Sequence, residues 1–396
     1  MIKALMNRTV NWRATHWWVA PLWGILAACG GDEPATDAQA TPTPPVRLAH
    51  VAPTLGPFAA EGTDAMRGAQ LAVEQANAAG YKLGEQATRI DLLTEDDAAD
   101  ATRAMDVARK LMAIPVNGVI GHLNNATALT AAKVYHAAGV PHLTVGATHP
   151  DLTQRGFNTA FRLLASDEQL AQALAVHGIK RLKLTQVAVL DDGSAYGQVL
   201  AKAFATALTD GGAKVVAQAS LPAEAQAREA ALAPVWQAQP EAVFWGGFAG
   251  MLEPVWAAMQ GAGIKGPLLG GDGVCTEQLA KTLNPAPADD RLWCAEAGLV
   301  AGKPSTAMQA FNDAFKTRFG GAPGRYAAAS YDATQLLLDT MSRAKSAAPG
   351  VYLPMLAKAN YQGLLGPYAF DAKGNLKRPP VTLYQYKAGA KVAAGG

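Results

Sequence analysis

The residues that offer chemistry in this sequence lie in small, glycine-containing segments that follow apolar runs. In an open α/β sheet, ligands bind outside the carboxyl ends of the strands, and the backbone N–H groups of a helix start favour a carboxylate there. Segments of this kind that lead into helical spacing therefore predict a binding site for a small molecule. They are GHLNNAT (121–127), VGATHPD (145–151), DDGSAYG (191–197), WGGFAG (245–250) and GGDGV (270–274).

Three side chains within these segments suit a zwitterionic ligand. Asp272 carries a carboxylate that can pair with an ammonium group. Tyr196 and Phe248 supply aromatic walls for a cleft. Since the helix starts suit a carboxylate, the combined set suits a small zwitterion.

Patterns typical of catalytic centres do not occur in the sequence. It contains no G-x-x-x-x-G-K-[ST] loop and no G-x-S-x-G elbow. The glycines of 261–266 match a dinucleotide-binding pattern, but they follow a predicted helix and precede a strand, the reverse of the required order. His122, His142 and His149 lack the spacing of a helical zinc pair and stand beside no cysteine. We therefore predict no enzyme activity, no cofactor and no metal site.

Composition excludes several classes of protein. The chain has 396 residues, of which 50% are hydrophobic and 17% charged, and its net charge is +2. This much apolar material excludes a disordered polyelectrolyte, and the length suggests two domains. With a charge so close to zero, we expect no general attraction to nucleic acid.

The N-terminus has the pattern of an export signal. Basic residues precede an apolar stretch over 17–28 that is too short to span a membrane. LAAC (26–29) resembles a bacterial lipobox, whose cysteine becomes the lipid-modified first residue of the mature protein. We predict a lipoprotein signal peptide at 1–28, lipid attachment at Cys29 and a flexible Pro-rich tether at 29–45. The protein would be periplasmic and anchored to a bacterial membrane; an ordinary signal peptide is the alternative.

The other two cysteines, Cys275 and Cys294, have 18 residues between them. An even pair of thiols in an exported protein favours a disulfide. A metal site is the weaker alternative, because only two thiols are present and no histidine lies between them.

From Val46 onward, short β-rich runs alternate with alanine-rich helical runs. Such alternation predicts parallel sheets covered by helices on both faces, and two series of this length predict two doubly wound α/β lobes. Strands are predicted at 46–52, 89–93, 117–121, 141–146, 186–190, 213–218, 242–246 and 267–270. Helices are predicted at 64–79, 97–113, 126–138, 167–177, 196–210, 224–238 and 249–260. Asp97 is a candidate cap for the second of these helices.

The pattern changes after Ala301. Two or three helices are expected over 306–359. The turn residues 373–375 then precede an alternating strand, VTLYQY. We expect this tail to form a hairpin added to a finished lobe.

Six stretches, taken in order, carry a resemblance to a known family: NGVIGHLNNAT, ATHPDLTQRGFNTAFR, LDDGSAYGQVLA, FWGGF, LLGGDGV and LLGPYAFDAKGNL. Over 46–386 the chain resembles the leucine/isoleucine/valine-binding proteins of ABC transporters, in the type I periplasmic binding protein family. Members of that family close on an amino acid by hinge motion and have no catalytic residues.

The resemblance implies two doubly wound Rossmann-like lobes joined by three hinge crossings, near Ala165, Leu299 and Gly366. The implied boundaries are 46–165 and 299–365 for lobe 1, and 166–298 and 366–396 for lobe 2.

The resemblance also implies a set of ligand-binding residues. Thr148 takes the position of a partner of the ligand's α-amino-acid group. Asp272 takes that of the ammonium-binding acid, one methylene shorter than the usual glutamate. The remaining positions supply backbone contacts or aromatic walls, and they fall on Leu123, Gly146, Tyr196, Phe248 and Tyr326.

Two positions depart from the family pattern. Asn125 stands in place of a ligand-binding serine; it keeps a donor but is bulkier. Glu61 stands in place of an aromatic residue, and a carboxylate at the rim of an apolar pocket is costly to bury. Glu61 would therefore point to water or select a polar or cationic ligand. The resemblance thus supports the amino-acid class better than leucine itself.

We expect a monomeric substrate-binding lipoprotein that captures an amino acid, of branched-chain type or a close analogue, and delivers it to a membrane permease. An amide, an aromatic acid, a nucleobase or a cationic amino acid is the alternative ligand. A sensory module that reports to a receptor is the alternative role.

Overall fold

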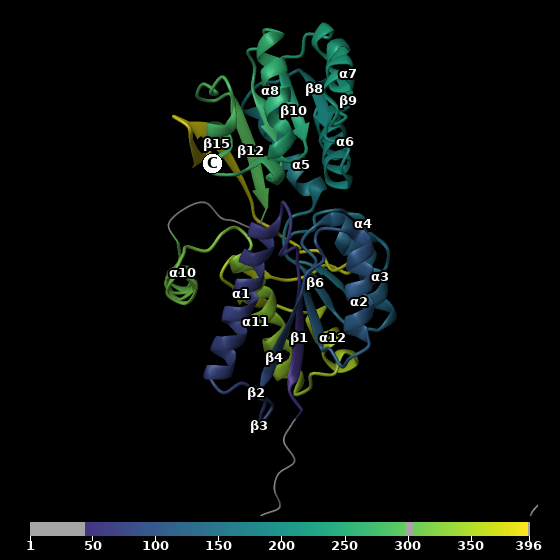
Figure 1. The fold of residues 1–396 in the computed structure, drawn as a ribbon, viewed down its shortest axis with the longest axis vertical. Helices are drawn as coiled ribbons and strands as arrows, with labels where there is room; N and C mark the ends of the chain where they lie inside the picture. The colour runs from purple at the N-terminus through teal and green to yellow at the C-terminus, as the bar shows by residue number, and fades with distance from the viewer. Residues whose placement is uncertain (1–43, 298–303, 395–396) are drawn as a thin grey trace, which may run out of the picture. The chain divides into compact units, whose positions relative to one another are not determined.

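The structure is a computed structural model that describes residues 44–297 and 304–394. The predicted signal peptide, Cys29, nearly all of the tether and the crossing at Leu299 lie outside the described residues. Two large sheets with helices packed on them form the described body (Figure 1). We call the five-stranded sheet and its helices lobe 1, and the seven-stranded sheet and its helices lobe 2. The α/β prediction is confirmed.

The strands of the lobe 1 sheet all run parallel, in the order β4-β1-β5-β6-β7. The side chains of β1 pack in two different apolar clusters, because neighbouring side chains of a strand point to opposite faces of the sheet. Val46 and Leu48 belong to one cluster, and Ala49 and Val51 belong to the other. The strands are β1 (Val46–Val51), β4 (Ile90–Glu95), β5 (Gly118–Gly121), β6 (His142–Thr144) and β7 (Ala160–Arg162). The helices are α1 (Ala59–Ala78), α2 (Ala101–Met112), α3 (Asn125–Ala137), α11 (Ala327–Ala344) and α12 (Pro349–Leu356). Helices α1 and α11 lie side by side (Figure 1).

Lobe 2 repeats this arrangement and extends it. Its sheet has the order β16-β15-β12-β11-β10-β8-β9, in which β8 to β12 are parallel and β15 and β16 antiparallel. The alternation again divides neighbours, with Val187 and Val189 in one cluster and Ala188 and Leu190 in another. The strands are β8 (Gln186–Asp191), β9 (Lys214–Ser220), β10 (Ala242–Gly246), β11 (Leu268–Gly270), β12 (Leu292–Ala297), β15 (Val381–Lys387) and β16 (Ala390–Ala393). The helices are α5 (Asp167–Lys180), α6 (Ala195–Asp210), α7 (Ala225–Gln237) and α8 (Leu252–Gly261).

Each parallel sheet has a switch point at which the strand order reverses. In lobe 1 it lies between β1 and β5, and in lobe 2 between β8 and β10. A crevice opens at the carboxyl ends of the strands at such points. The loop after β5 carries Leu123 and leads into Asn125, the first residue of α3, and the loop after β10 carries Phe248. The fold therefore brings predicted site residues to both crevices.

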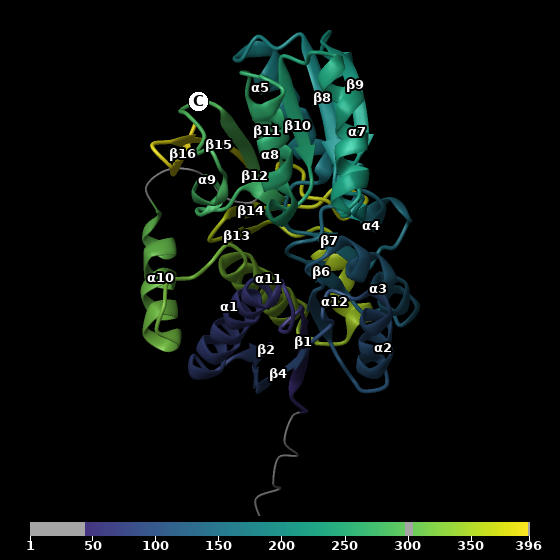
Figure 2. The same cartoon turned by 45° about the horizontal axis from the view of Figure 1, so that its top comes forward.

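Shorter elements complete the described body. Helix α10 (Thr306–Phe319) lies beside α1 (Figure 2). Its Phe311 and Phe315 belong to one apolar cluster with Leu71 of α1. The remaining elements are β2 (Lys82–Leu83), β3 (Gln86–Ala87), α4 (Asp151–Gln154), α9 (Leu279–Thr282), β13 (Tyr361–Gly363), β14 (Gly366–Tyr368) and the 3-10 turns Ala249–Met251 and Asp272–Val274.

The predicted capping role of Asp97 is wrong. Helix α2 begins later, and its cap is Asp100, whose side chain accepts a hydrogen bond from the Arg103 N–H. The Asp97 carboxylate is fully buried and lies 2.6 Å from Nδ1 of His122. The backbone of Ala98 and Ala99 has positive φ, so a helix cannot run through this segment.

The predicted C-terminal hairpin is also wrong in its pairing. Residues 373–375 do form a turn, but it brings Phe370 to Leu376 and sets Asn375 beside Arg162 of β7. The VTLYQY strand instead pairs with β12 and β16. Two prolines between Leu376 and Val381 lack the N–H groups that a continued ladder would need.

The core clusters show where the chain passes between the lobes. Leu163 packs in lobe 1 and Leu164 in lobe 2, beside Ala165. Tyr368 and Leu376 still pack in the core of lobe 1, so the last passage lies after Leu376, later than the predicted crossing near Gly366.

Fully buried histidines in lobe 1 predict an acid-sensitive stability. Burial, with His122 nearby, lowers the pKa of His50 to about 3, although Asp97 opposes the shift. Below about pH 6.5 the unfolded chain binds a proton at His50 that the folded chain excludes until about pH 3, so stability falls with pH. Between pH 6 and 4, the free energy of unfolding of the wild type should fall by about 1.4 kcal/mol per pH unit relative to that of His50→Leu. Urea titrations of both proteins at each pH measure this difference. Parallel pH profiles of the two proteins would contradict this.

Candidate functional site

A cleft of about 1390 Å³ is lined by residues of both lobes. It contains eight of the nine residues that the sequence predicts to bind a ligand; Thr148 lies outside its lining. Those that line it from lobe 1 are Glu61, Leu123, Asn125, Gly146 and Tyr326. Those from lobe 2 are Tyr196, Phe248 and Asp272.

Asn125 presents only one end of its amide to the cleft. As the first residue of α3, it accepts hydrogen bonds at Oδ1 from the N–H groups of Thr148 (2.7 Å) and His149 (3.0 Å). Its carbonyl oxygen thus holds the neighbouring loop, and its NH₂ group remains as a donor. Thr148 is buried behind this contact, so its role as a direct ligand partner stays a prediction.

The glycine at 146 is required by close packing against Leu123. A Cβ atom at this position would lie 2.5 Å from Cδ1 of Leu123. The two loops of lobe 1 that carry Leu123 and Gly146 therefore touch where they line the cleft. Any larger residue at position 146 would push these loops apart.

Tyr196 and Asp272 form a hydrogen-bonded pair on the lobe 2 wall. The Tyr196 hydroxyl donates to Oδ1 of Asp272 over 2.7 Å and accepts from the Gly273 N–H at 3.0 Å. Burial raises the pKa of Tyr196 well above its usual value, so it stays a donor. A Cβ at Gly273 would lie 2.9 Å from the tyrosine ring, so glycine is needed for this approach.

Phe248 is held in place by the acidic loop after β8. Its N–H donates to Oδ2 of Asp192 at 3.0 Å, while Oδ1 of Asp192 accepts from the Ser194 N–H at the start of α6. The DDGS segment is therefore a strand-to-helix loop with occupied oxygens. Among the described residues, no group of three or more His, Cys, Asp or Glu side chains could hold a metal ion.

Arg325 is the cleft residue that sequence reasoning missed. It precedes α11 in lobe 1, yet its Nη2 lies 2.5 Å from Oδ2 of Asp272 and its Nη1 donates to the Asp272 carbonyl at 2.8 Å. Its Nε also lies 3.2 Å from Oε1 of Glu296 on β12. Burial alone would lower the pKa of Arg325, but nearby Tyr326, Asp272 and Glu296 together raise it above its usual value.

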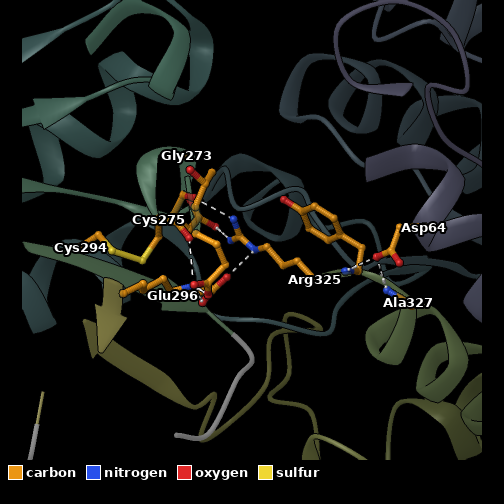
Figure 3. A network of polar contacts seen from close by, with 12 residues as sticks. Asp64, Gly273, Cys275, Cys294, Glu296, Arg325 and Ala327 are labelled. Atoms are coloured by element: carbon orange, nitrogen blue, oxygen red, sulfur yellow. Dashed lines mark hydrogen bonds and ion pairs between the residues drawn. A yellow bond between two sulfur atoms is a disulfide. The ribbon is translucent and has the colours of Figure 1, made fainter. Parts of the chain in front are cut away.

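Asp64 of α1 fixes the segment that carries Arg325. Its carboxylate accepts from the N–H groups of Gly324 (2.7 Å), Tyr326 (2.8 Å) and Ala327 (2.9 Å), and so caps the start of α11. Figure 3 shows Arg325 extending away from Asp64 and Ala327 toward Glu296 and Gly273. No pattern in the sequence marks this arrangement, since a lone arginine beside a glycine usually lies on a solvated loop.

Two further residues near the cleft were also missed. Phe58, just before α1, lines the cleft and meets Phe248 edge to face, with ring centres 5.4 Å apart. Asp167 begins α5 and is fully buried, and neither carboxylate oxygen has a hydrogen-bond partner among the described residues. Burial raises its pKa to about 7. No motif in the sequence marks Phe58, and Asp167 looks like part of an ordinary helix start.

The predicted disulfide is present, with the two sulfur atoms of Cys275 and Cys294 2.05 Å apart. Cys275 follows the turn of Asp272 and lines the cleft, and Cys294 lies two residues before Glu296 in β12 (Figure 3). The bond therefore ties together the two segments that contact Arg325.

The sequence profile of periplasmic binding proteins matches residues 45–391, almost the whole described body. The chain belongs to the periplasmic binding protein family. A Leu/Ile/Val-binding protein homolog of Brucella abortus is 30% identical over 353 residues, which cover 85% of this chain and 89% of the relative. The resemblance inferred from the six stretches is therefore confirmed.

Solved structures of this family share the fold. The leucine binding protein of Thermotoga maritima matches with a TM-score of 0.77 and 24% identity, over 88% of this chain and 98% of that one. A solute binding protein of an ABC transporter from R. palustris, solved with benzoate, matches with a TM-score of 0.74 and 21% identity. The match covers 89% of this chain and 96% of that one. Within the described ranges, no helix of this binding protein is long and apolar enough to cross a bilayer.

Proposed function

We propose that this protein is the substrate-binding component of an ABC transporter. It captures an amino acid of branched-chain type, or a close analogue, in the cleft between its lobes and delivers it to a membrane permease. Capture takes place by closure of the two lobes around the ligand, without chemical change of the ligand.

The observation that carries this proposal is the convergence of the predicted residues. Loops from both switch points meet at one cleft, with donors on lobe 1 and an aromatic pair on lobe 2. The backbone N–H groups at the start of α3 suit a carboxylate, and Phe58, Tyr196 and Phe248 suit an apolar side chain. The Brucella relative, whose name refers to leucine, isoleucine and valine, supports the same ligand class.

The remaining parts of the proposal concern location and assembly. A periplasmic protein attached through lipidated Cys29 would stay close to its permease, with 29–45 as a tether. We propose that it acts as a monomer, because both walls of the cleft come from one chain. The Pro- and Thr-rich composition of the tether supports this placement.

Calorimetric titration of the purified protein tests the ligand class. The panel contains the twenty amino acids, amides, nucleobases, and aliphatic and aromatic carboxylic acids. We expect one ligand class to bind with 1:1 stoichiometry and micromolar or tighter affinity. Phe248→Ala should weaken that binding about tenfold, because it removes an aromatic wall. The absence of binding across the whole panel would contradict the proposed function.

A further inference from the structure

The buried and half-buried carboxylates that line the cleft all have partners already. Asp64 accepts three backbone N–H groups, and Asp332 accepts those of Leu364 and Leu365 together with the Tyr368 hydroxyl. Glu296 pairs with Arg325 and Lys391. An ammonium group that entered the cleft would therefore have to share a carboxylate with a partner that is already present.

Asp272, the residue predicted to hold an ammonium, also has a partner on each carboxylate oxygen. Its Oδ1 accepts from Tyr196 and its Oδ2 pairs with Arg325, and its backbone carbonyl accepts a second N–H of the same guanidinium. The side chain is only 7% exposed. A second cation at this carboxylate would be repelled by the guanidinium at short range, and that repulsion is strong where water is excluded.

Arg325 still has donors to offer. A guanidinium carries five N–H groups in a fixed fork, which matches the geometry of a carboxylate. The hydrogen bonds to Asp272 use one N–H on each terminal nitrogen, and the second N–H on each has no partner within the described ranges. Arg325 lines the cleft, as does Asn125 on the same lobe, whose NH₂ group has no hydrogen-bond partner within the described ranges. Both polar residues therefore present donors to a ligand.

The exposed carboxylates at the rim are the main opposing feature. Glu61 and Glu277 line the cleft and are open to water, Glu277 with 72% of its side chain exposed. Water screens such charges, so they attract a passing cation weakly and do not define a desolvated pocket for one. A cationic ligand held at this rim is nevertheless a distinct outcome of the experiment below.

We propose that Arg325 takes the place of a ligand ammonium against Asp272, and so selects ligands that carry a carboxylate but no α-ammonium group. This inference rests on the proposed function, because it narrows the ligand class of the same cleft. The ligand carboxylate receives the remaining N–H groups of Arg325 or the NH₂ of Asn125, and the aromatic walls receive an apolar chain. In this assignment Asp272 and Asp64 are positioning residues that hold the arginine.

Matched pairs of ligands test the inference directly. Each pair shares one carbon skeleton and differs only by the ammonium group: leucine with 4-methylpentanoate, and phenylalanine with 3-phenylpropanoate. Titration of the wild-type protein should show the desamino acid of at least one pair binding about tenfold tighter or better than its amino acid. Tighter binding of the amino acid in both pairs would overturn the inference while leaving the proposed function intact. Tightest binding of lysine or arginine would overturn the inference and would favour a cationic ligand held by the exposed carboxylates at the rim.

A variant of the arginine gives the second measurement. Arg325→Gln removes the competing cation, so the ratio of the two affinities should shift about 100-fold toward the amino acid. The matched control is Arg318→Gln, which removes an exposed arginine of α10 that pairs with Glu74 of α1, and it should leave the ratio unchanged. Equal weakening of both ligands by Arg325→Gln would show a purely structural role and overturn the inference.

Two further outcomes are also decisive. If Arg325→Gln does not fold, Arg325→Lys keeps the competing cation but loses the fork, so both ligands should bind more weakly while the ratio of their affinities stays close to that of the wild type. A ratio that moves tenfold or more toward the amino acid in a folded Arg325→Lys protein would show that the charge does not exclude the ammonium group, and would overturn the inference. Failure of every ligand of both pairs and of the wider panel would overturn the proposed function itself, and the inference with it.

Discussion

Asp272→Ala is expected to weaken binding of the tightest ligand about 100-fold, a loss of about 2.7 kcal/mol. The carboxylate holds the Tyr196 hydroxyl and the Arg325 guanidinium, one from each lobe. Without it, the tyrosine loses its acceptor and the arginine keeps only Glu296 and the backbone carbonyl of residue 272, so both walls must be reordered when a ligand binds. Truncating one partner of a desolvated charge pair costs about 2–5 kcal/mol in other interfaces, which sets this scale.

Two controls separate this effect from a general loss of structure. Asp210→Ala removes an exposed carboxylate at the end of α6, the helix that carries Tyr196, and should leave affinity unchanged. Asp272→Asn keeps an acceptor for Tyr196 but loses the charge, so it should fall between the wild type and alanine. Calorimetric titration and urea unfolding of all four proteins measure both properties. An Asp272→Ala protein that binds within threefold of the wild type would show that Asp272 does not organise the site.

The repeating part of the fold was predictable because its cause is local. Buried parallel strands are continuous apolar runs, as in 186–190 and 242–246, and the helices between them end at glycine or begin at polar residues. Apolar residues recur every three to four positions in these helices but are continuous in the buried strands. Each run could therefore be assigned to a helix or a strand from a few residues. The strands β8 and β10 lie where these runs occur.

The parts of the fold that were predicted wrongly or missed depend on contacts between residues that are distant in the sequence. The turn at 373–375 matched a hairpin, but Arg162, far away in the sequence, is buried and takes Asn375 as a partner. Strand β12 was not predicted, because its short run, LWCAEA, contains a glutamate that is buried only through Arg325 and Lys391. Such pairs are visible only once the chain is folded.

The residues of the candidate site likewise include some that could be predicted from the sequence and one that could not. Tyr196, Phe248 and Asp272 could be singled out because each follows a predicted strand. Arg325 could not, because its position comes from Asp64, which lies on another helix and has no neighbour in the sequence that marks it. The sequence thus singled out Asp272 by its place after a strand, but it did not reveal its partner Arg325. A sequence shows which groups carry charge, but the pairing of those charges follows from tertiary structure.

Removal of the disulfide is expected to destabilise lobe 2 by about 3 kcal/mol, the value for closing a loop of this length in the chain-entropy description. The bond joins Cys275 to Cys294 across a separation of 19 residues, and both sulfur atoms belong to the buried core of lobe 2. The double variant Cys275→Ala/Cys294→Ala should therefore unfold at lower urea than the wild type.

Tryptophan fluorescence reports this loss selectively. Every tryptophan that the structure describes lies in lobe 2, and these are Trp236, Trp245, Trp256 and Trp293. The fluorescence transition should move to lower urea in the double variant, while the part of the circular dichroism change due to lobe 1 should move little, because that lobe has its own core.

Reductant provides the matched control for the disulfide. Added to the wild type, it should reproduce the midpoint of the double variant; added to the variant, it should change nothing. Ligand affinity should fall as well, because the bond fixes the Asp272 turn to the strand that carries Glu296. A wild-type midpoint that is the same with and without reductant would contradict a stabilising role, since the loop would then be ordered by packing alone.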